Sequence, residues 1–376
     1  MGTQAVRIGL VGCGAFARQA VAQFLKLPDV RVTALCDPDP EAARLGTSAF
    51  GALGVPLAEM LVLRDDVDLV YIASPPGLHH RHALTAMRAR KHVLCEAPLG
   101  ITKPEADELV ATACAVGRLL VATLTPRYNP VYDAVKRMLA GGLLGDVLHG
   151  SMESHTSDAA RAPEHWFWDP KLGGGLFVQQ AVHGLDPCEG WLGPGQVVAA
   201  QASRRDSGLE DQVQCTLAHP HGVHASHYYG CAQPAPLTEQ ITRLVCERGT
   251  ITLHGWPLTR IEIRALVTHD TQAHLLSLLP GAHVETLATY TGDRRQLSGR
   301  HKPFEADALI ALSHGDSIDG PTRFGELLRS LLADQLAWIR DPSHPRRVTE
   351  EHARRAVALA DAARQLAAPT GSCDGQ

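Results

Sequence analysis

The sequence predicts an α/β fold in which a doubly wound parallel sheet is followed by an α+β domain with a large open sheet, mixed or antiparallel. Strand-like and helix-like patterns alternate over the first 125 residues, as in a parallel sheet covered on both faces. After residue 146, strand-like runs follow one another with few helices between them, which is typical of a mixed or antiparallel sheet. Because 376 residues exceed one usual domain, we expect two, over residues 1–126 and 127–376.

The elements of the first domain follow from short apolar runs and the amphipathic stretches between them. Strands are expected at residues 7–11, 30–36, 67–73, 92–95 and 119–125. Helices are expected at residues 15–26, 41–50, 80–90 and 104–116.

The second domain is expected to begin with a helix in RYNPVYDAVKRML, where Asn129 suits the N-cap and Pro130 the first helical position. Alternating strands are expected at residues 147–153, 197–203, 212–218, 223–229, 241–246 and 261–266, with a hairpin turn at Pro220-His-Gly. Residues 267–304 are interpreted as loop. A helix at 350–366 closes the pattern, and we expect it to pack back on the first domain.

The composition excludes several classes of function. The chain has 35 basic and 40 acidic residues without a long run of one sign, which argues against a nucleic-acid or membrane-surface role. No apolar window has the length of a membrane span, and no signal peptide is recognisable. We therefore expect a soluble, cytoplasmic protein.

Metal binding and disulfide bonding are also disfavoured. The nine cysteines are scattered and include no Cys-x-x-Cys pair, so a disulfide framework or zinc knuckle is not expected. Two histidine clusters, HHRH at 79–82 and HPHGVHASH at 219–227, lack a familiar ligand spacing with an acidic partner. No metal site is expected.

A glycine-rich turn directly follows the first strand. Gly12, Gly14 and Ala17 have the spacing G-x-G-x-x-A, which permits a tight turn, close approach of a pyrophosphate and helix–strand packing. A strand precedes the turn, a helix follows it, and Asp37 ends the second strand at the expected separation. The Asp37 carboxylate can accept hydrogen bonds from ribose hydroxyls and would repel a 2′-phosphate, so NAD is favoured over NADP. The alternative interpretation is an aspartate that only starts the turn DPDP.

Three segments together resemble the Gfo/Idh/MocA oxidoreductases, the glucose-fructose oxidoreductase and inositol dehydrogenase family. They are IGLVGCGAFA, ASPPGLHHRHALTAMRARKHVLCEAPLG and GGGLFVQQAVHGLD, and the resemblance weakens after about residue 270. It implies a Rossmann domain followed by an open-sheet domain used for oligomerisation, hence a homodimer or homotetramer. It also implies cofactor contacts at the strand ends, from Gly12, Gly14, Ala15, Phe16, Asp37, Ser74, Pro75, His79 and Glu96.

The chain departs from the family at its catalytic positions. The family signature Glu-Lys-Pro provides a lysine for proton transfer, and here HVLCEAPLG has Ala97 in that place. The second signature has an acid four residues before a histidine and an aspartate three residues after it, and here these positions hold Gln179, His183 and Asp186. Because neither alanine nor glutamine can act as a base, His183 is the residue in the motif that can exchange the proton. The alternative is a histidine with only a packing role.

Other side chains are candidates for substrate contacts. Arg127 and Tyr128 follow the last strand of the first domain, so we expect them to reach the cleft. His165, Trp166 and Trp168 lie in EHWFWDP, ahead of a triple glycine, where aromatic rings can stack on a substrate ring or pin the loop to the core.

These observations predict an NAD-dependent oxidoreductase that acts on a small polar substrate (sugar-, polyol- or imine-like) with His183 as acid/base. Three alternatives remain open. The first is a non-redox family member, glycosidase- or lyase-like, that uses NAD transiently, and the second is a nucleotide-binding protein without catalysis. The third is a lysine-to-alanine variant of an ordinary dehydrogenase, with activity impaired by Ala97.

Overall fold

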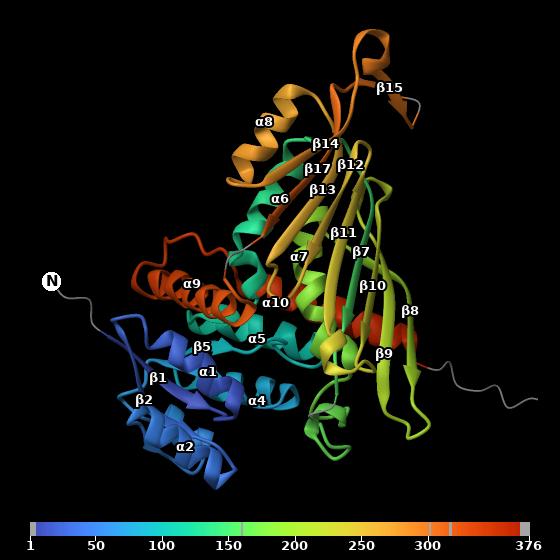
Figure 1. Ribbon diagram of the computed structural model, residues 1–376. Coiled ribbons are helices and arrows are strands. Elements are labelled where there is room, and N and C mark those ends of the chain that lie inside the picture. The colour runs from blue at the N-terminus through green and yellow to red at the C-terminus, as the bar shows by residue number, and fades with distance from the viewer. Residues whose placement is uncertain (1–4, 159–160, 301, 316–317, 369–376) are drawn as a thin grey trace, which may run out of the picture. The chain divides into compact units, whose positions relative to one another are not determined.

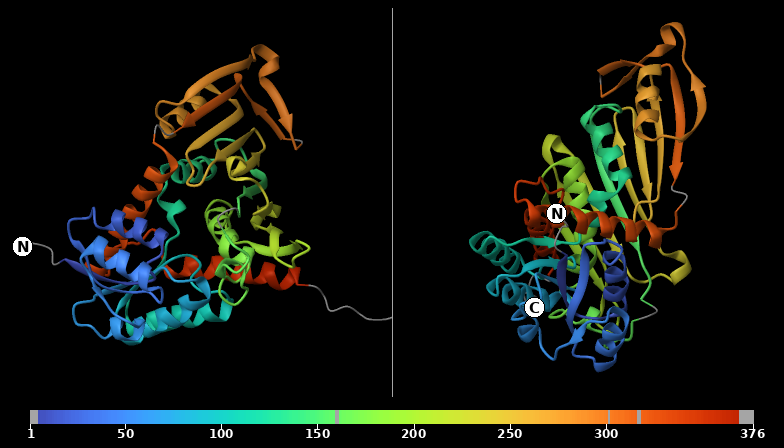
Figure 2. Two further views of the ribbon diagram at one scale, coloured as in Figure 1. Left: turned by 60° about the horizontal axis from the view of Figure 1, so that its bottom comes forward. Right: turned by 90° about the vertical axis from the view of Figure 1, so that its left-hand side faces the viewer.

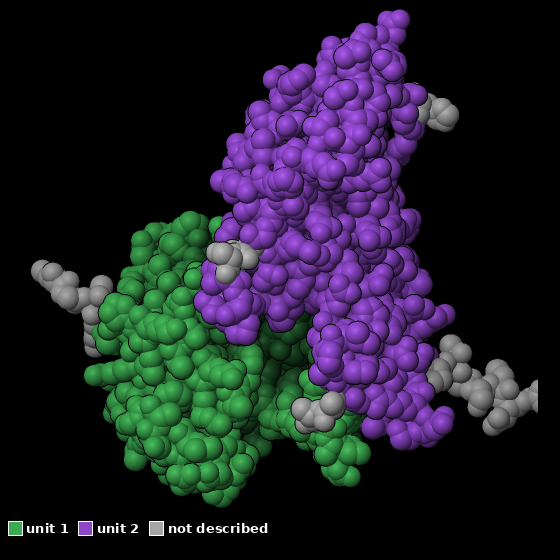
Figure 3. Space-filling model, viewed as in Figure 1, with its two compact units in different colours: residues 1–128, 161–186, 324–364 green, residues 129–160, 187–323, 365–376 purple. Residues whose placement is uncertain are grey.

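The computed structural model describes residues 5–158, 161–300, 302–315 and 318–368. The chain divides into two compact units (Figure 3). Unit 1 comprises residues 1–128, 161–186 and 324–364, and unit 2 comprises 129–160, 187–323 and 365–376. The first change of unit falls after residue 128, and two later segments also belong to unit 1.

Unit 1 contains a six-stranded parallel sheet, in agreement with the predicted fold class. Its strand order is β3-β2-β1-β4-β5-β6, so successive strands are added on one side of β1 up to β3 and on its other side from β4 onward. Figure 1 labels β1, β2 and β5 of this sheet. The strands are β1 (Val6–Val11), β2 (Val30–Cys36), β3 (Leu53–Gly54), β4 (Leu69–Ile72), β5 (His92–Cys95) and β6 (Leu120–Ala122). In sheets of this order ligands bind beyond the carboxyl ends of the strands, at the point of reversal.

Helices connect these strands, and the sequence predicted four of them with different boundaries. They are α1 (Ala15–Phe24), α2 (Pro40–Phe50), α3 (Ala58–Val62), α4 (Pro76–Arg88) and α5 (Lys103–Val116). The predicted start of α4 at residue 80 was wrong, because Pro76 takes a first-turn position that needs no N–H donor. The predicted strand 119–125 ends early, because residues Thr125–Tyr128 form the 3₁₀ turn η1.

The later segments of unit 1 complete its core. They contain the 3₁₀ turn η2 (Trp166–Trp168), the π-helical turn η3 (Phe177–Ala181) and the beginning of α7 (Val182–Leu192). Most of α9 (Gly320–Arg340) and α10 (Glu350–Ala367) belongs to the same unit. The predicted helix 350–366 is confirmed, and buried residues of α9 and α10 share one core cluster with the strands: Leu328, Leu331, Leu332, Leu336, Ala353 and Val357.

Unit 2 contains a nine-stranded mixed sheet, as predicted, with the order β14-β17-β13-β12-β11-β7-β10-β9-β8. Only the pairing of β10 with β7 is parallel within the described sheet. The strands are β7 (Val147–His155), β8 (Gln196–Arg204), β9 (Glu210–Ala218), β10 (His224–Gly230), β11 (Glu239–Cys246), β12 (Gly249–His254), β13 (Arg260–Val267), β14 (His283–Thr289) and β17 (Ala308–Gly315). The hairpin turn expected at Pro220 joins β9 to β10.

Helices cover part of this sheet. The predicted helix after Asn129 is α6 (Pro130–Ala140), and the Asn129 side chain accepts a hydrogen bond from the Val131 N–H at 2.8 Å. Its buried face packs with the strands around Ile251, Ile263 and Ile310. Figure 2 shows α6 alongside the strands from two further directions.

The interpretation of residues 267–304 as loop was wrong. This stretch contains α8 (His269–Leu278), β14 and the small hairpin of β15 (Gln296–Gly299) and β16 (Lys302–Glu305). The signal was weak because α8 buries only Leu275 among its residues, and because β14 is an edge strand with mostly exposed side chains. In the described part of the chain, no helix combines the length and apolarity that a membrane span requires.

Candidate functional site

The glycine-rich turn after β1 has the geometry of a dinucleotide cradle. Gly12 has φ +93°, and a Cβ atom there would lie 2.7 Å from the backbone carbonyl of Ala73, so only glycine fits. Gly14 caps α1 without a side-chain hydrogen bond, and a Cβ at Gly14 would meet nothing within 4 Å. The start of α1 therefore has no side-chain cap and has room beside Gly14, which fits the pyrophosphate of a dinucleotide.

Asp37 joins this turn to the end of β2. One carboxylate oxygen accepts a hydrogen bond from the Cys13 N–H at 2.6 Å, and the other accepts one from the Asp39 N–H at 2.9 Å. Asp37 thus holds the backbone at Cys13 and starts the turn DPDP, and its contact with ribose hydroxyls stays a prediction. A carboxylate oxygen has more than one lone pair, so these bonds leave capacity for ribose hydroxyls.

His79 ties together the ends of two neighbouring strands. The side chain is 1% exposed, and its ring nitrogens lie 2.7 Å from the Pro98 carbonyl oxygen and 2.6 Å from the Ser74 carbonyl oxygen. Burial lowers the pKa of His79, while the two carbonyl contacts act in the opposite direction. The residue therefore links the turn after β4 to the turn after β5, and its contact with the cofactor stays a prediction.

Glu96 follows β5 and is enclosed by hydroxyl groups. The Thr123 hydroxyl donates to one carboxylate oxygen at 2.6 Å, and the Tyr71 hydroxyl donates to the other. Burial raises the pKa of Glu96 to about 7, although both hydrogen bonds oppose the shift. Sequence reasoning missed Tyr71 and Thr123, whose only signal is a hydroxyl group in or just after an apolar strand.

Ala97 occupies the position of the family lysine. Its backbone N–H donates to the Thr123 hydroxyl at 3.2 Å, which places it next to the Glu96 network, and its methyl group packs on the core of unit 1. The position is therefore held by its backbone and offers no group that exchanges a proton.

The second signature is built on η3 and the first turn of α7. His183 lies on α7, and burial lowers its pKa to about 4, so its imidazole is neutral at pH 7. Gln179 is buried and its amide donates to the Phe167 carbonyl at 2.7 Å. The geometry gives Gln179 a backbone partner, and its predicted place among the catalytic positions stays a prediction.

Arg127 and Asp186 form a buried ion pair. The Arg127 Nε lies 2.8 Å from a carboxylate oxygen of Asp186, and the two side chains are 9% and 2% exposed. The Tyr128 hydroxyl donates a hydrogen bond to the Asp334 carboxylate at 2.6 Å and accepts a hydrogen bond from the Gln335 amide at 3.1 Å. These residues hold the end of β6 against later segments of unit 1, and their contact with a substrate stays a prediction.

The aromatic residues of η2 have divided roles. Phe167 is buried with the Arg161 guanidinium 4.2 Å above its ring, whereas Trp166 is 36% exposed. His165 lies beside Trp166, with ring centroids 5.1 Å apart, and Trp168 packs edge-on against Phe167. Burial lowers the pKa of His165. Phe167 thus anchors the turn while Trp166 presents an accessible ring.

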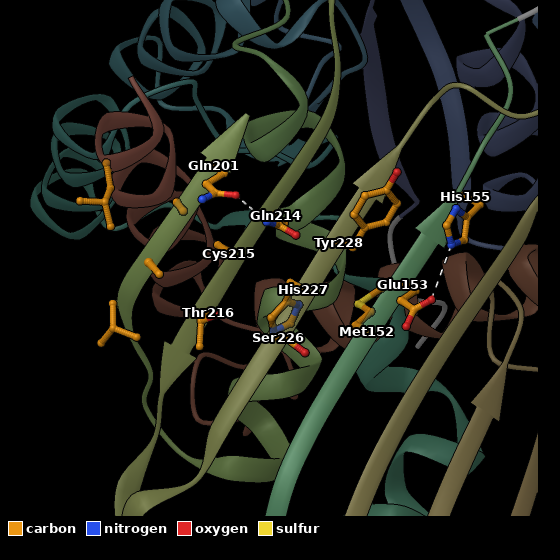
Figure 4. A pocket seen from close by; sticks show the side chains of 14 residues that line it. Met152, Glu153, His155, Gln201, Gln214, Cys215, Thr216, Ser226, His227 and Tyr228 are labelled. Atoms are coloured by element: carbon orange, nitrogen blue, oxygen red, sulfur yellow. Dashed lines mark hydrogen bonds and ion pairs between the residues drawn. The ribbon is translucent and has the colours of Figure 1, made fainter. Parts of the chain in front are cut away.

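Unit 2 contains a separate concavity on its sheet, about 780 Å³ in volume (Figure 4). Gln201, Gln214, Tyr228 and Glu153 stand in register across β8, β9, β10 and β7. The Gln214 amide donates to Gln201 at 2.7 Å, and the rings of His155 and Tyr228 are 5.1 Å apart. The lining combines polar side chains with apolar ones such as Met152, Val198 and Leu366. Among the described residues, no group of three or more His, Cys, Asp or Glu side chains is placed to hold a metal ion.

Two family models match the chain. Residues 6–123 match the model described as an oxidoreductase family with an NAD-binding Rossmann fold, and residues 132–252 match the GFO/IDH/MocA C-terminal domain. Together they cover most of both units.

Curated relatives include two kinds of enzyme. The dTDP-3,4-didehydro-2,6-dideoxy-alpha-D-glucose 3-reductase of Streptomyces violaceoruber is 30% identical over 231 residues, which are 60% of this chain and 67% of that protein. A glycosyl hydrolase family 109 protein of Saccharopolyspora erythraea is 32% identical over 211 residues, 50% of this chain and 44% of that protein. The second match thus spans less than half of the relative.

Solved structures confirm the fold over nearly the whole chain. The WlbA dehydrogenase of Bordetella pertussis, in complex with NADH and UDP-GlcNAcA, has a TM-score of 0.76 at 20% identity and covers 98% of this chain and 96% of its own. KijD10, a 3-ketoreductase of Actinomadura kijaniata in complex with NADP and TDP-benzene, has a TM-score of 0.74 at 23% identity and covers 96% of this chain and 98% of its own. The two complexes hold different nicotinamide cofactors.

Proposed function

Because the chain belongs to the Gfo/Idh/MocA family of NAD(P)-dependent oxidoreductases, we propose that it transfers a hydride between NAD and a small sugar-, polyol- or imine-like substrate, with His183 handling the proton. The cradle at Gly12 and Gly14 carries the nucleotide part of this proposal, since it leaves the first turn of α1 uncapped. When bound, the nicotinamide supplies or accepts the hydride. The protein residues orient the reactants and move the proton.

The proton step differs from the family scheme because Ala97 cannot take part in it. His183 is neutral near pH 7, so one ring nitrogen carries a proton and the other can accept one. A neutral imidazole can stabilise a developing oxyanion by donating a hydrogen bond. A group with a pKa of about 4 is a weak base at neutral pH. This site therefore favours substrates that need little assistance with proton transfer, such as an imine or an activated carbonyl.

Asp37 supports the choice of NAD over NADP. Titration calorimetry should show tighter binding of NAD(H) than of NADP(H), because a 2′-phosphate would approach the carboxylate that holds Cys13. Asp37→Ala should narrow the difference in affinity between NAD(H) and NADP(H). Asp39→Ala, which removes the nearby exposed carboxylate, serves as the control. Tighter binding of NADP(H) by the unaltered protein would overturn the assignment.

A second candidate function has one specific observation in its favour. The relative in glycosyl hydrolase family 109 is 32% identical over 211 residues, so a transient oxidation during glycoside cleavage is the runner-up. The two functions differ in their use of the cofactor. A dehydrogenase consumes NAD in proportion to product, whereas the hydrolytic scheme releases sugar without net change in NAD.

We also expect a cytoplasmic homodimer or homotetramer that associates through the nine-stranded sheet. The eight described cysteines are free thiols, which fits a reducing compartment. The concavity on the sheet lies among accessible side chains of β7, β8, β9 and β10, where a second copy could bind (Figure 4).

A further inference from the structure

The segment 161–176, which we call the aromatic segment, is docked on the two turns that carry the candidate site. The Gly77 N–H, at the start of α4, donates to the Leu172 carbonyl at 2.7 Å. A Cβ atom at Gly77 would lie 2.0 Å from the Lys171 carbonyl oxygen, so the two backbones touch. At Gly174 a Cβ would lie 2.9 Å from side-chain carbons of Ile101 and Val178.

Gln179, which follows the aromatic segment in the chain, holds this segment at Phe167. Its amide nitrogen is 2.7 Å from the Phe167 carbonyl oxygen, at the centre of the turn Trp166–Trp168. Gly173 makes room for this contact, since a Cβ there would lie 2.3 Å from the Gln179 Nε2 and 2.7 Å from the Phe167 oxygen. The Gln179 N–H is itself held by the Gly175 carbonyl at 3.0 Å.

The chemistry of this contact selects glutamine. A carbonyl oxygen accepts hydrogen bonds, so the group facing it must donate, as the amide NH₂ does. An ionised glutamate of the same length would place an acceptor against an acceptor in a buried place. Leaving a buried polar group without its hydrogen bond costs about 1–3 kcal/mol.

We propose that Gln179 is a positioning residue that fixes the aromatic segment as a wall of the substrate site, and that this wall determines which substrates are accepted. Phe167 is the buried anchor, and Trp166 with His165 is the accessible surface. The proposal rests on the proposed oxidoreductase function. It differs from the family pattern, in which an acid at the position of Gln179 belongs to the catalytic signature.

The test compares Gln179→Glu with Gln365→Glu, which makes the same change at an exposed position of α10. Hydrogen exchange of residues 161–176 is measured from pH 8 to pH 5. In Gln179→Glu, exchange should be about tenfold faster at pH 8, the free-energy equivalent of one lost buried hydrogen bond. It should return toward the normal rate at pH 5, because a protonated carboxyl can donate. The control should match the unaltered protein at every pH.

Activity gives the second readout. With NADH as the probe, Gln179→Glu should bind the nucleotide within about twofold of normal while KM for the substrate rises more than kcat falls, as expected for lost ground-state positioning. If Gln179→Glu does not fold, Gln179→Met keeps the length without a donor and should show fast exchange that no pH restores. Normal exchange in either variant at pH 8 overturns the proposal. If NADH binds and no substrate turns over, the proposed function fails, while the exchange data still decide the role of Gln179.

Discussion

At the scale of single residues, Ala97 lies beside a hydrogen-bonded network but has no side-chain group that exchanges a proton. Ala97 sits on the Thr123 hydroxyl, beside a Glu96 carboxyl whose pKa is raised to about 7 by burial. Glu96 therefore has a pKa near neutral pH, and its oxygens accept hydrogen bonds from Tyr71 and Thr123. Because Ala97 has no group that exchanges a proton, our proposal assigns this step to His183.

Two substitutions separate a disabled dehydrogenase from a diverged one. If the alanine is what slows the chain, Ala97→Lys should raise hydride transfer to a polyol or sugar-like substrate by about 10²–10⁴-fold, the usual contribution of a general acid/base. If the chain works without the lysine, the added cation should crowd the site and give no gain. His183→Ala should then abolish the native turnover while NAD binding persists. Steady-state kinetics and calorimetry measure both.

The sequence predicted residues whose role is set by the backbone better than residues whose role is set by distant contacts. The tight turn of the cradle was predictable because Gly12 answers a local steric demand. The buried contact of Arg127 with Asp186, 59 positions away, was not predictable from the local sequence. The same holds for the buried contact of Gln179 with Phe167, 12 positions away. The lowered pKa of His183 likewise depends on burial that the motif does not reveal.

At the scale of elements, prediction succeeded where a periodic pattern was complete. Strands β2 and β5 have the predicted bounds, because each is a short run of mostly buried apolar residues between polar or turn residues. Prediction failed at β14 and α8, because these elements bury few side chains and therefore show little hydrophobic periodicity. The π-helical turn η3 was also unpredicted, since nothing local in FVQQA marks it.

The open face of the nine-stranded sheet supports a prediction about assembly. Light scattering at micromolar concentration should give the mass of a dimer or tetramer. Tyr228→Glu, placed opposite Glu153 in the register, should shift the mass toward the monomer by adding like charge to the concavity. Glu285→Gln, on the distant edge strand β14, should leave the mass unchanged. A monomeric unaltered protein would contradict the expectation.

At the scale of the whole molecule, histidines with lowered pKa values contribute to the response to mild acid. Burial lowers the pKa of His82, His92 and His183 to about 4 and that of His227 to about 3. Between pH 6.5 and 4 the unfolded chain binds protons at these four sites that the folded chain does not, so stability falls as the pH falls through this window. Glu96 acts oppositely, because its raised pKa of about 7 lets the folded state keep a proton that the unfolded state loses.

Because four histidines destabilise the folded state as the pH falls and only Glu96 opposes them, we expect a lower free energy of unfolding at pH 5 than at pH 7. Denaturant unfolding at the two pH values measures this difference. His92→Gln, which removes one of the four groups away from the candidate site, should flatten this pH dependence. Equal stability at the two pH values would show that the buried histidines do not control the acid response.

The most direct test of the central claim follows the hydride itself. NADH carrying deuterium at C4 of the nicotinamide is incubated with the protein and a panel of keto-sugar, nucleotide-linked keto-sugar and imine substrates, and the products are analysed by mass spectrometry. We predict that deuterium appears on carbon in one reduced product, in proportion to the NAD formed, and that His183→Ala abolishes its transfer. NADH binding without deuterium in any product would contradict the oxidoreductase function.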